Sequence, residues 1–209
     1  DVFIRASNFM EIGNYYRNIF SKLLFFLSLG KNIMKKILFS CCAVATLLTS
    51  CKTTTENSAD SKKIVMQLEA KSGSNASGVA TFSEKDGEVT FTANIKGLKP
   101  GIHAIHIHEK GDCSAADATS AGGHWNPTFT KHGKWGASEY HKGDIGNFTV
   151  DAAGNGSITM STDEWCIGCD DDTKNIVGKS IIVHEGADDF ITQPTGDAGG
   201  RAACAAIIK

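Results

Sequence analysis

Apolar and polar residues alternate along much of the chain after residue 64. Between Glu88 and Ile95 every second residue is apolar, which is the period of a β-strand with one buried face. Similar but shorter patterns predict further strands at 64–68, 78–82, 148–151, 157–160, 180–183 and 202–208. Turn residues at 83–87 and 153–156 join two pairs of these strands into predicted hairpins. Because no long segment has helical periodicity, we predict an all-β antiparallel sandwich or barrel.

The segment Gly101–His108, which reads GIHAIHIH, combines a strand pattern with candidate metal ligands. Successive side chains of a strand point to opposite faces. His106 and His108 therefore share one face, and the two isoleucines that alternate with them point into the core. Two imidazoles held on one rigid strand suit copper or zinc. His103 falls on the opposite face, where we expect a structural hydrogen-bonding role.

The other histidines strengthen the case for a metal site. The chain has seven histidines, and none lies in the first hundred residues. His124, His132 and His141 follow the strand pair in one segment, with Asp144 beside them, and His184 ends a late strand. These residues offer enough nitrogen and oxygen ligands for two metals. Scattered surface histidines are the alternative, and the His-x-His strand makes it the weaker one.

Several segments resemble the copper/zinc superoxide dismutase family, and they come in the family's order between about residue 64 and 209. These segments are His103–Asp112, Ser120–Pro127, Lys131–Gly133, His141–Asn147, Val183–Asp189 and Gly200–Cys204. The resemblance implies a Greek-key β-sandwich or barrel. It also implies long metal-binding loops, here at 109–143 and 185–200, and loops of that length in a compact β domain usually carry function.

The resemblance also implies a ligand set and a reaction. Copper would be bound by His106, His108, His124 and His184, and zinc by His124, His132, His141 and Asp144. His124 would bridge the two ions as an imidazolate and deliver a proton to the reduced substrate. The activity implied is the disproportionation of superoxide to dioxygen and hydrogen peroxide. Copper would do the redox work, and zinc, which has no accessible redox change, would order its loop.

Two further roles follow from the resemblance. Asp188 would accept hydrogen bonds from His106 and His132 and so link the two metal sites. Arg201 would attract and orient a small anion at the mouth of the copper channel, against the alternative of an ordinary surface arginine. Residues 190–200 hold no lysine, so long-range steering would rest on Arg201, with Lys131 or Lys134 as additional candidates.

The cysteines fall into three sets. Cys41 and Cys42 belong to a predicted signal peptide, and Cys51 to a predicted lipid attachment site. Four cysteines remain, an even number that suits an oxidising compartment. By the resemblance Cys113 pairs with Cys204, closing a loop of about 90 residues worth about 4 kcal/mol. The run Cys166–Cys169 is open to three interpretations, a local disulfide, a redox pair or an accessory metal site, of which we favour the local disulfide.

The N-terminal part predicts a bacterial lipoprotein. Residues 34–50 have the basic start and apolar run of a secretory signal, and Cys51 stands where a lipoprotein cleavage box has its cysteine. Residues 51–63 would carry the lipid and form a flexible tether, and residues 64–209 would form the superoxide dismutase domain. We interpret residues 1–33 as an upstream extension from a start site placed too early.

The charge and the predicted location limit which classes of partner the protein can have. From Lys52 onward the chain has 15 Lys and Arg against 21 Asp and Glu, a formal charge of −6, so a nucleic-acid backbone is an unsuitable partner. The predicted location is the periplasmic side of the cell envelope, with membrane contact through the lipid on Cys51. A homodimer is left open. The competing functions are a non-catalytic lipoprotein that stores or delivers metal, and a zinc hydrolase, which would lack an open coordination position.

Overall fold

The computed structural model describes residues 61–209. Within this range the chain forms eight strands and one short 3₁₀-helix: β1 Lys62–Ala70, β2 Ser77–Lys85, β3 Glu88–Lys96, β4 Gly101–His108, η1 Thr119–Ala121, β5 Gly146–Val150, β6 Asn155–Thr162, β7 Ser180–His184 and β8 Arg201–Ala206. The described residues contain no helix long and apolar enough to cross a membrane. The predicted extension, signal peptide and Cys51 lie outside the described residues, as does the tether up to residue 60. β1 begins at Lys62, two residues before the predicted start of the domain.

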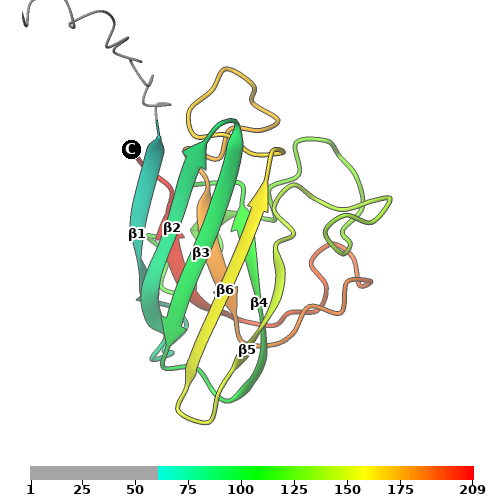
Figure 1. Ribbon diagram of the computed structural model, residues 1–209. Coiled ribbons are helices and arrows are strands. Elements are labelled where there is room, and N and C mark those ends of the chain that lie inside the picture. The colour runs from blue at the N-terminus through cyan, green and yellow to red at the C-terminus, as the bar shows by residue number, and fades with distance from the viewer. Residues whose placement is uncertain (1–60) are drawn as a thin grey trace, which may run out of the picture. The chain divides into compact units, whose positions relative to one another are not determined.

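The described strands close into an antiparallel barrel in the order β1-β2-β3-β6-β5-β4-β7-β8 (Figure 1). At two places in this barrel, which we call seams, neighbouring strands are joined by only one or two residue pairs. β5 meets β6 at the pair Val150 and Gly156, and β1 meets β8 at two neighbouring pairs near Ala70. The barrel is therefore flattened into two four-stranded layers, β1-β2-β3-β6 and β5-β4-β7-β8. The predicted all-β antiparallel fold is confirmed, and the terms sandwich and barrel describe the same object.

The hairpin between β2 and β3 corrects one predicted boundary. We expected a turn at 83–87, but β2 continues to Lys85, which pairs with Glu88. The turn is reduced to Asp86 and Gly87, whose φ values are 53° and 82°. Two consecutive residues with positive φ match the right-handed twist of paired strands, so the two-residue turn extends both strands to full length. β8 likewise ends at Ala206, two residues before the predicted end.

The main core lies between the two layers. The alternating apolar residues of β3 are buried as predicted, and Phe91 packs on Phe82 of β2 with ring centroids 4.8 Å apart. Trp165, from the connection between β6 and β7, meets Phe82 edge to face at 5.8 Å. Each of these fully buried aromatic side chains contributes about 2–3 kcal/mol of hydrophobic free energy. This core makes the layer that carries the histidines rigid.

β4, like its neighbour β7, is buried on both faces. Ile105 and Ile107 enter the main core, whereas His106 and His108 point out of the barrel and are still 0–1 % exposed. They are covered because the long connections that follow β4 and β7 fold back over this outer face. The disulfide Cys113–Cys204 ties the first of these connections to β8. The fold thus builds a closed space outside the barrel wall.

Candidate metal centre

Two strands and one loop bring the six candidate histidines together outside the β4-β7 wall. His106 and His108 come from β4, and His184 from the end of β7, whose neighbour in the layer is β4. His124 lies in the loop between β4 and β5 and forms an isolated antiparallel bridge with His108. His132 and His141 come from the same loop, and all six side chains are 0–6 % exposed. These residues lie far apart in the sequence, and the β4-β7 wall and the β4–β5 loop bring them together.

The ligand-type atoms form two groups that share one residue. The first group is His106, His108, His124 and His184; the second is His124, His132, His141 and Asp144. Within each group the donor atoms lie within 4.8 Å of one another. These are the two sets that the sequence resemblance implied for copper and for zinc. His124 belongs to both, because its ring lies between them with a nitrogen toward each.

The free nitrogens of the first group test whether these residues fit a metal. Nδ1 of His106 and Nε2 of His108, His124 and His184 are buried without a hydrogen-bond partner. The second nitrogen of each ring is engaged. His108 Nδ1 bonds the carbonyl of Gly122 at 2.9 Å, and His184 Nδ1 that of Gly199 at 3.4 Å. Buried polar atoms are normally satisfied, so four unpartnered nitrogens in one group fit a bound cation.

The second group is organised around Asp144. Its carboxylate oxygens lie 2.8, 3.0 and 3.3 Å from Nδ1 of His124, His132 and His141. Oδ2 also accepts hydrogen bonds from the backbone N–H of His141 and of Gly133. Burial opposes the charged form, but these contacts outweigh it and hold the pKa of Asp144 well below its ordinary value. Three imidazoles and one carboxylate are a closed tetrahedral set of the kind that holds structural zinc.

The two groups have opposite electrostatics. Burial, followed by the neighbouring histidines, lowers the pKa of His108 and of His184 well below the ordinary value, and burial lowers that of His124 to about 4. In the second group burial also lowers the pKa of His132, but hydrogen bonds to Asp144 and Asp188 outweigh it and raise the value to about 9. Without metal, His108, His124 and His184 are therefore neutral at pH 7, whereas His132 is charged and pairs with Asp144 and Asp188.

Asp188 joins the two groups from behind. One oxygen accepts from His106 Nε2 at 2.8 Å and the other from His132 Nε2 at 2.9 Å, so it fixes one ring of each group. Asp188 is itself held by Asn147, whose side chain exchanges two hydrogen bonds of 2.8 Å with its backbone. The neighbouring Asp189 is exposed and bonds Thr192 within its own turn. The two adjacent aspartates thus have different environments.

Arg201 and His103 lie on either side of His184. The Arg201 guanidinium donates to the carbonyls of Ala118 and Gly122 at 2.6 and 2.7 Å, and Gly122 also accepts from His108. The arginine is half-buried, so it is not an ordinary surface residue. His103 faces away from both groups. Its two nitrogens contact the carbonyls of His184 and Lys99 at 2.9 and 2.8 Å, which is a structural role.

The two candidate steering lysines have other contacts. Lys131 is exposed and pairs with Glu139 at 3.4 Å, and Lys134 lies 6.0 Å from the ring of Phe190. Gln193 was missed by the sequence reasoning. It exchanges hydrogen bonds of 2.9 Å with the backbone of His132 and so attaches the 185–200 loop to the second group. No local pattern marks such a residue, because its partner is 61 positions away.

The four described cysteines form two disulfides. Cys113 pairs with Cys204, and Cys166 with Cys169, as the resemblance and the spacing predicted. No thiolate is therefore available for an accessory metal site at Cys166. Asn175, which lies near this second disulfide, donates to the carbonyl of Cys169 at 3.0 Å.

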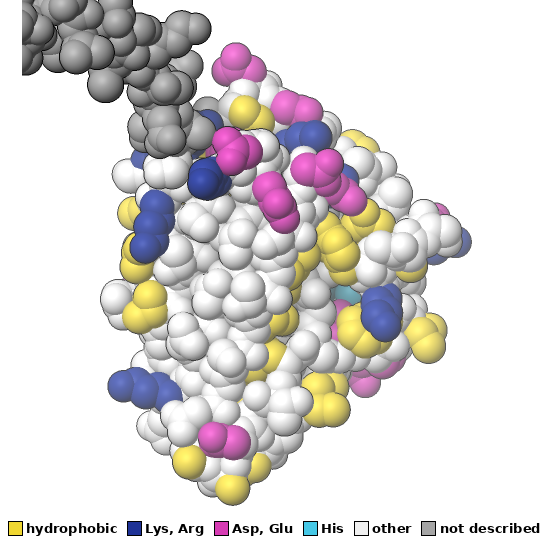
Figure 2. Space-filling model, viewed as in Figure 1, with side chains coloured by type: hydrophobic (Ala, Val, Ile, Leu, Met, Phe, Trp, Pro, Cys, Tyr) yellow, Lys and Arg dark blue, Asp and Glu magenta, His cyan; other side chains and the backbone are white. Residues whose placement is uncertain are grey.

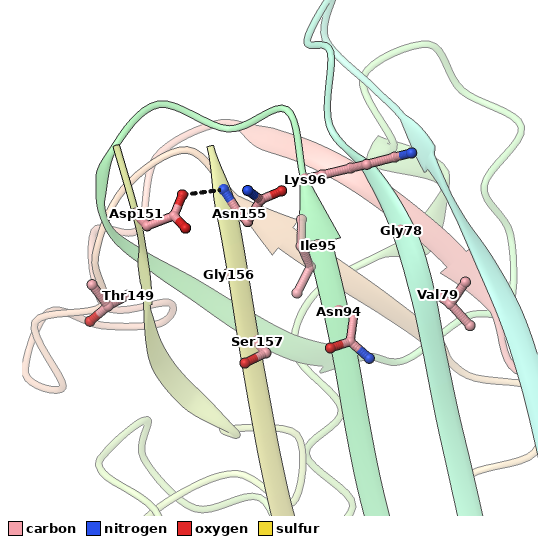
Figure 3. A pocket seen from close by; sticks show the side chains of 10 residues that line it. All are labelled: Gly78, Val79, Asn94, Ile95, Lys96, Thr149, Asp151, Asn155, Gly156 and Ser157. Carbon is pink, nitrogen blue, oxygen red and sulfur yellow. Dashed lines mark hydrogen bonds between the residues drawn. The ribbon is translucent and has the colours of Figure 1, made fainter. Parts of the chain in front are cut away.

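The surface outside the metal centre has a different character. A shallow groove of about 750 Å³ crosses the seam between β5 and β6, where Asp151 accepts from the backbone of Asn155 at 2.9 Å (Figure 3). Its lining contains no histidine and no cysteine. In Figure 2 the face shown carries acidic and basic side chains, and histidine is barely visible, in agreement with the burial of the cluster. The chemistry-bearing residues are thus concentrated under the loops.

Comparisons with known proteins agree with this site. The profile of the copper/zinc superoxide dismutase (SODC) family matches residues 76–207. Among solved structures, the crystal structure of the clock protein EA4 is 32 % identical with a TM-score of 0.61, covering 70 % of this chain and 94 % of that one. The family profile covers both loops and all six candidate histidines. The chain therefore belongs to the copper/zinc superoxide dismutase family, whose members are oxidoreductases that use copper and zinc.

Proposed function

We propose that this protein disproportionates superoxide with copper held by the first group and zinc held by the second. Copper when bound supplies the one-electron chemistry, since zinc has no accessible redox change. The assignment extends the family's reaction to particular residues: His106, His108, His124 and His184 for copper, and His124, His132, His141 and Asp144 for zinc.

One observation carries the proposal, the double engagement of His124. Its Nδ1 lies 2.8 Å from Asp144, inside the second group, and its Nε2 is a buried unpartnered atom of the first group. A ring fixed in this way can hold a metal on each side as an imidazolate. Its Nε2 would also be the atom that takes up a proton and gives it to a reduced anion beside it.

The remaining residues bind, orient and support. Arg201 offers a positive charge beside the first group, which attracts a small anion, and its two carbonyl contacts keep the guanidinium in place. Asp188 holds the orientation of His106 and His132. The loops exclude bulk water from the histidines, which are nearly completely buried. The geometry of the rings is therefore a property of the loops and of the wall together.

The location is a further part of the proposal. The basic and apolar segment 34–50, followed by Cys51, supports a lipid-anchored protein on the periplasmic side of a bacterial membrane, where it would protect the cell envelope from superoxide. Fractionation of cells that produce the wild type or Cys51→Ser checks this point. We expect the wild type in the membrane fraction and the variant outside it. Gel filtration of the released domain decides whether it forms a homodimer.

The activity is tested with purified protein loaded with both metals. We expect superoxide dismutation with one copper and one zinc per chain, and at least a 100-fold loss in His184→Ala, which removes a ligand that only the first group uses. Asp189→Asn is the control, because this exposed carboxylate bonds only its own turn. Full binding of both metals without dismutation would instead assign the protein to metal storage or delivery.

A further inference from the structure

The connection between β6 and β7 lies against the loop that carries His141. This connection is the orange segment that crosses one end of the barrel in Figure 1. Its Trp165 is 1 % exposed and packs edge to face on Trp135 of the histidine loop, with ring centroids 5.2 Å apart. The indole N–H of Trp165 donates to the carbonyl of Lys142 at 2.9 Å. One neighbour of His141 is thus anchored to the connection.

The preceding residue, Glu164, anchors both neighbours of His141. Its carboxylate accepts from the hydroxyl of Tyr140 at 2.7 Å and from the ammonium group of Lys142. Glu164 and Trp165, which we call the clamp, therefore hold the residues before and after one member of the zinc group. Hydrogen bonds that orient a metal ligand tune its affinity as strongly as many direct contacts do.

The Cys166–Cys169 disulfide lies directly after the clamp. Cys166 is 7 % exposed, and its backbone bonds Lys174 and Ile176 at 2.9 and 3.1 Å. These contacts fix one end of the disulfide to the returning part of the connection. The disulfide therefore limits how far Trp165 can move, because the next residue along the chain is covalently and non-covalently held.

This disulfide differs from Cys113–Cys204 in what it can contribute to stability. It joins residues 3 positions apart, against 91 for the other, so it removes little entropy from the unfolded chain. In each disulfide one cysteine is buried, Cys166 or Cys204, and the other, Cys169 or Cys113, is half-buried. A thiol can therefore reach one sulfur of each bond, and the two bonds differ in what they contribute to stability. A bond that adds little global stability, is accessible and adjoins the clamp is suited to a reversible reaction.

We propose that Cys166–Cys169 is a thiol–disulfide exchange site whose reduction loosens the clamp and lowers the affinity of the second group for zinc. A thiolate of a partner dithiol attacks Sγ of Cys169, and the Cys166 thiolate leaves. The partner's second thiolate then attacks the mixed disulfide. The partner is oxidised to a disulfide by two electrons, and Cys166 and Cys169 become thiols after taking up two protons. The proposal rests on the assignment of zinc to the group that contains His141.

Zinc affinity in the two redox states tests the proposal. Metal-free protein is equilibrated with mixtures of reduced and oxidised glutathione, desalted under argon and titrated with zinc against a chromophoric chelator. Alkylation and peptide mass analysis show which disulfide is open. We expect Cys166–Cys169 to open while Cys113–Cys204 stays closed, with zinc binding about 10-fold weaker and copper binding unchanged. By reciprocity, bound zinc should make Cys166–Cys169 about 10-fold harder to reduce.

Two variants separate the redox step from the clamp. Cys166→Ser/Cys169→Ser should bind zinc as weakly as the reduced wild type, and its zinc affinity should not change with the glutathione mixture. Trp165→Phe keeps an aromatic ring but loses the indole N–H that donates to Lys142, and should weaken zinc binding with the disulfide intact. Equal zinc affinity in oxidised and reduced wild type, or prior opening of Cys113–Cys204, would overturn the proposal. Failure of oxidised wild type to bind zinc at all would instead contradict the zinc assignment.

Discussion

The two groups of the metal centre share His124 and the same wall of the barrel, yet they differ in charge. The first group consists of four imidazoles, and burial and mutual repulsion keep the pKa values of His108 and His184 low. The second contains Asp144, whose carboxylate contacts three imidazoles, and Asp188 lies behind His132. The second group thus has a carboxylate among its donor atoms, and the first group has none.

This difference agrees with the proposed assignment of zinc to the second group and copper to the first. A zinc ion keeps a fixed charge, so a carboxylate among its ligands compensates it permanently and makes a stable structural site. An ion that cycles between two charges is better served by a ligand set without a carboxylate, because no fixed carboxylate charge then favours one of its states. A cation bound by ligands without a carboxylate also keeps more of its positive charge, which attracts a small anion. Arg201 lies beside this group. Through the shared ring of His124, the charge-compensated second group positions one ligand of the reactive first group.

The largest expected effect comes from removing the carboxylate at the centre of the second group. Asp144→Asn should lower the free energy of unfolding of the metal-free protein by about 3–5 kcal/mol, because it breaks a buried network of ion pairs and backbone hydrogen bonds. It should also abolish tight zinc binding. Urea unfolding and zinc titration measure these two effects. Asp189→Asn, in an exposed turn, should change the free energy of unfolding by less than about 0.5 kcal/mol.

The pH dependence of metal-free stability separates the two groups next. His132 has a raised pKa of about 9, so its stabilisation is complete below the unfolded value of about 6.5 and is lost as pH rises through 9. His108, His124 and His184 have lowered pKa values, so the unfolded state binds more protons and stability falls as pH drops below about 6.5. Asp144 and Asp188, with lowered pKa values, add to the acid loss below about pH 4.

The acid limb should therefore be steeper than the alkaline limb, since three protons act on one side and one on the other. Each proton contributes at most about 1.4 kcal/mol per pH unit. Urea unfolding of metal-free protein from pH 5 to 9 measures both slopes. His132→Gln should flatten the alkaline limb and leave the acid limb unchanged. A flat profile above pH 7 in the wild type would contradict the charge difference between the groups.

A smaller effect is expected where the two groups are joined. Asp188→Asn keeps the shape of the side chain but can no longer accept at both oxygens from His106 and His132. Zinc affinity should fall about 10–100-fold, because this carboxylate orients and polarises a ligand. Copper affinity should fall less, since His106 is also held by strand β4, whereas His132 lies in a loop. Equal losses of the two metals would mean that Asp188 orients both rings to the same degree.

The sequence predicted the wall better than the loops. The alternation in β3 and the His-x-His pattern of β4 are local periodicities, so strand identity and the facing of His106 and His108 followed from them directly. The prediction of a five-residue turn at 83–87 was wrong. The turn consists of Asp86 and Gly87, which take the positive φ values of a two-residue hairpin. Strand ends depend on such backbone preferences, which a hydrophobic pattern does not contain.

The histidine cluster could be inferred, but its supports could not. The grouping of the ligands rested on several family motifs in order, and the structure brings the same residues together. Gln193 and the clamp at Glu164 and Trp165 act through contacts between segments that are 22 to 61 positions apart. A glutamine or a glutamate in a polar loop looks like any solvated residue until the loop's packing is known. Tertiary contacts of this kind leave no local pattern.

Arg201 gives the smallest expected effect, and it concerns the first group alone. Arg201→Gln removes the positive charge beside His108 and His184 but keeps a side chain that can donate to Gly122. The kcat/KM for superoxide should fall about 10-fold, and its decrease with ionic strength should become weaker, because an anion is no longer attracted to the first group. Copper and zinc content should not change. Lys96→Gln is the matched control, since it removes one charge from the groove at the β5–β6 seam, away from the histidines. If both variants lost the same fraction of activity, net charge would explain the result. A loss confined to Arg201→Gln would show that the charge acts locally, at the group that has no carboxylate among its ligands.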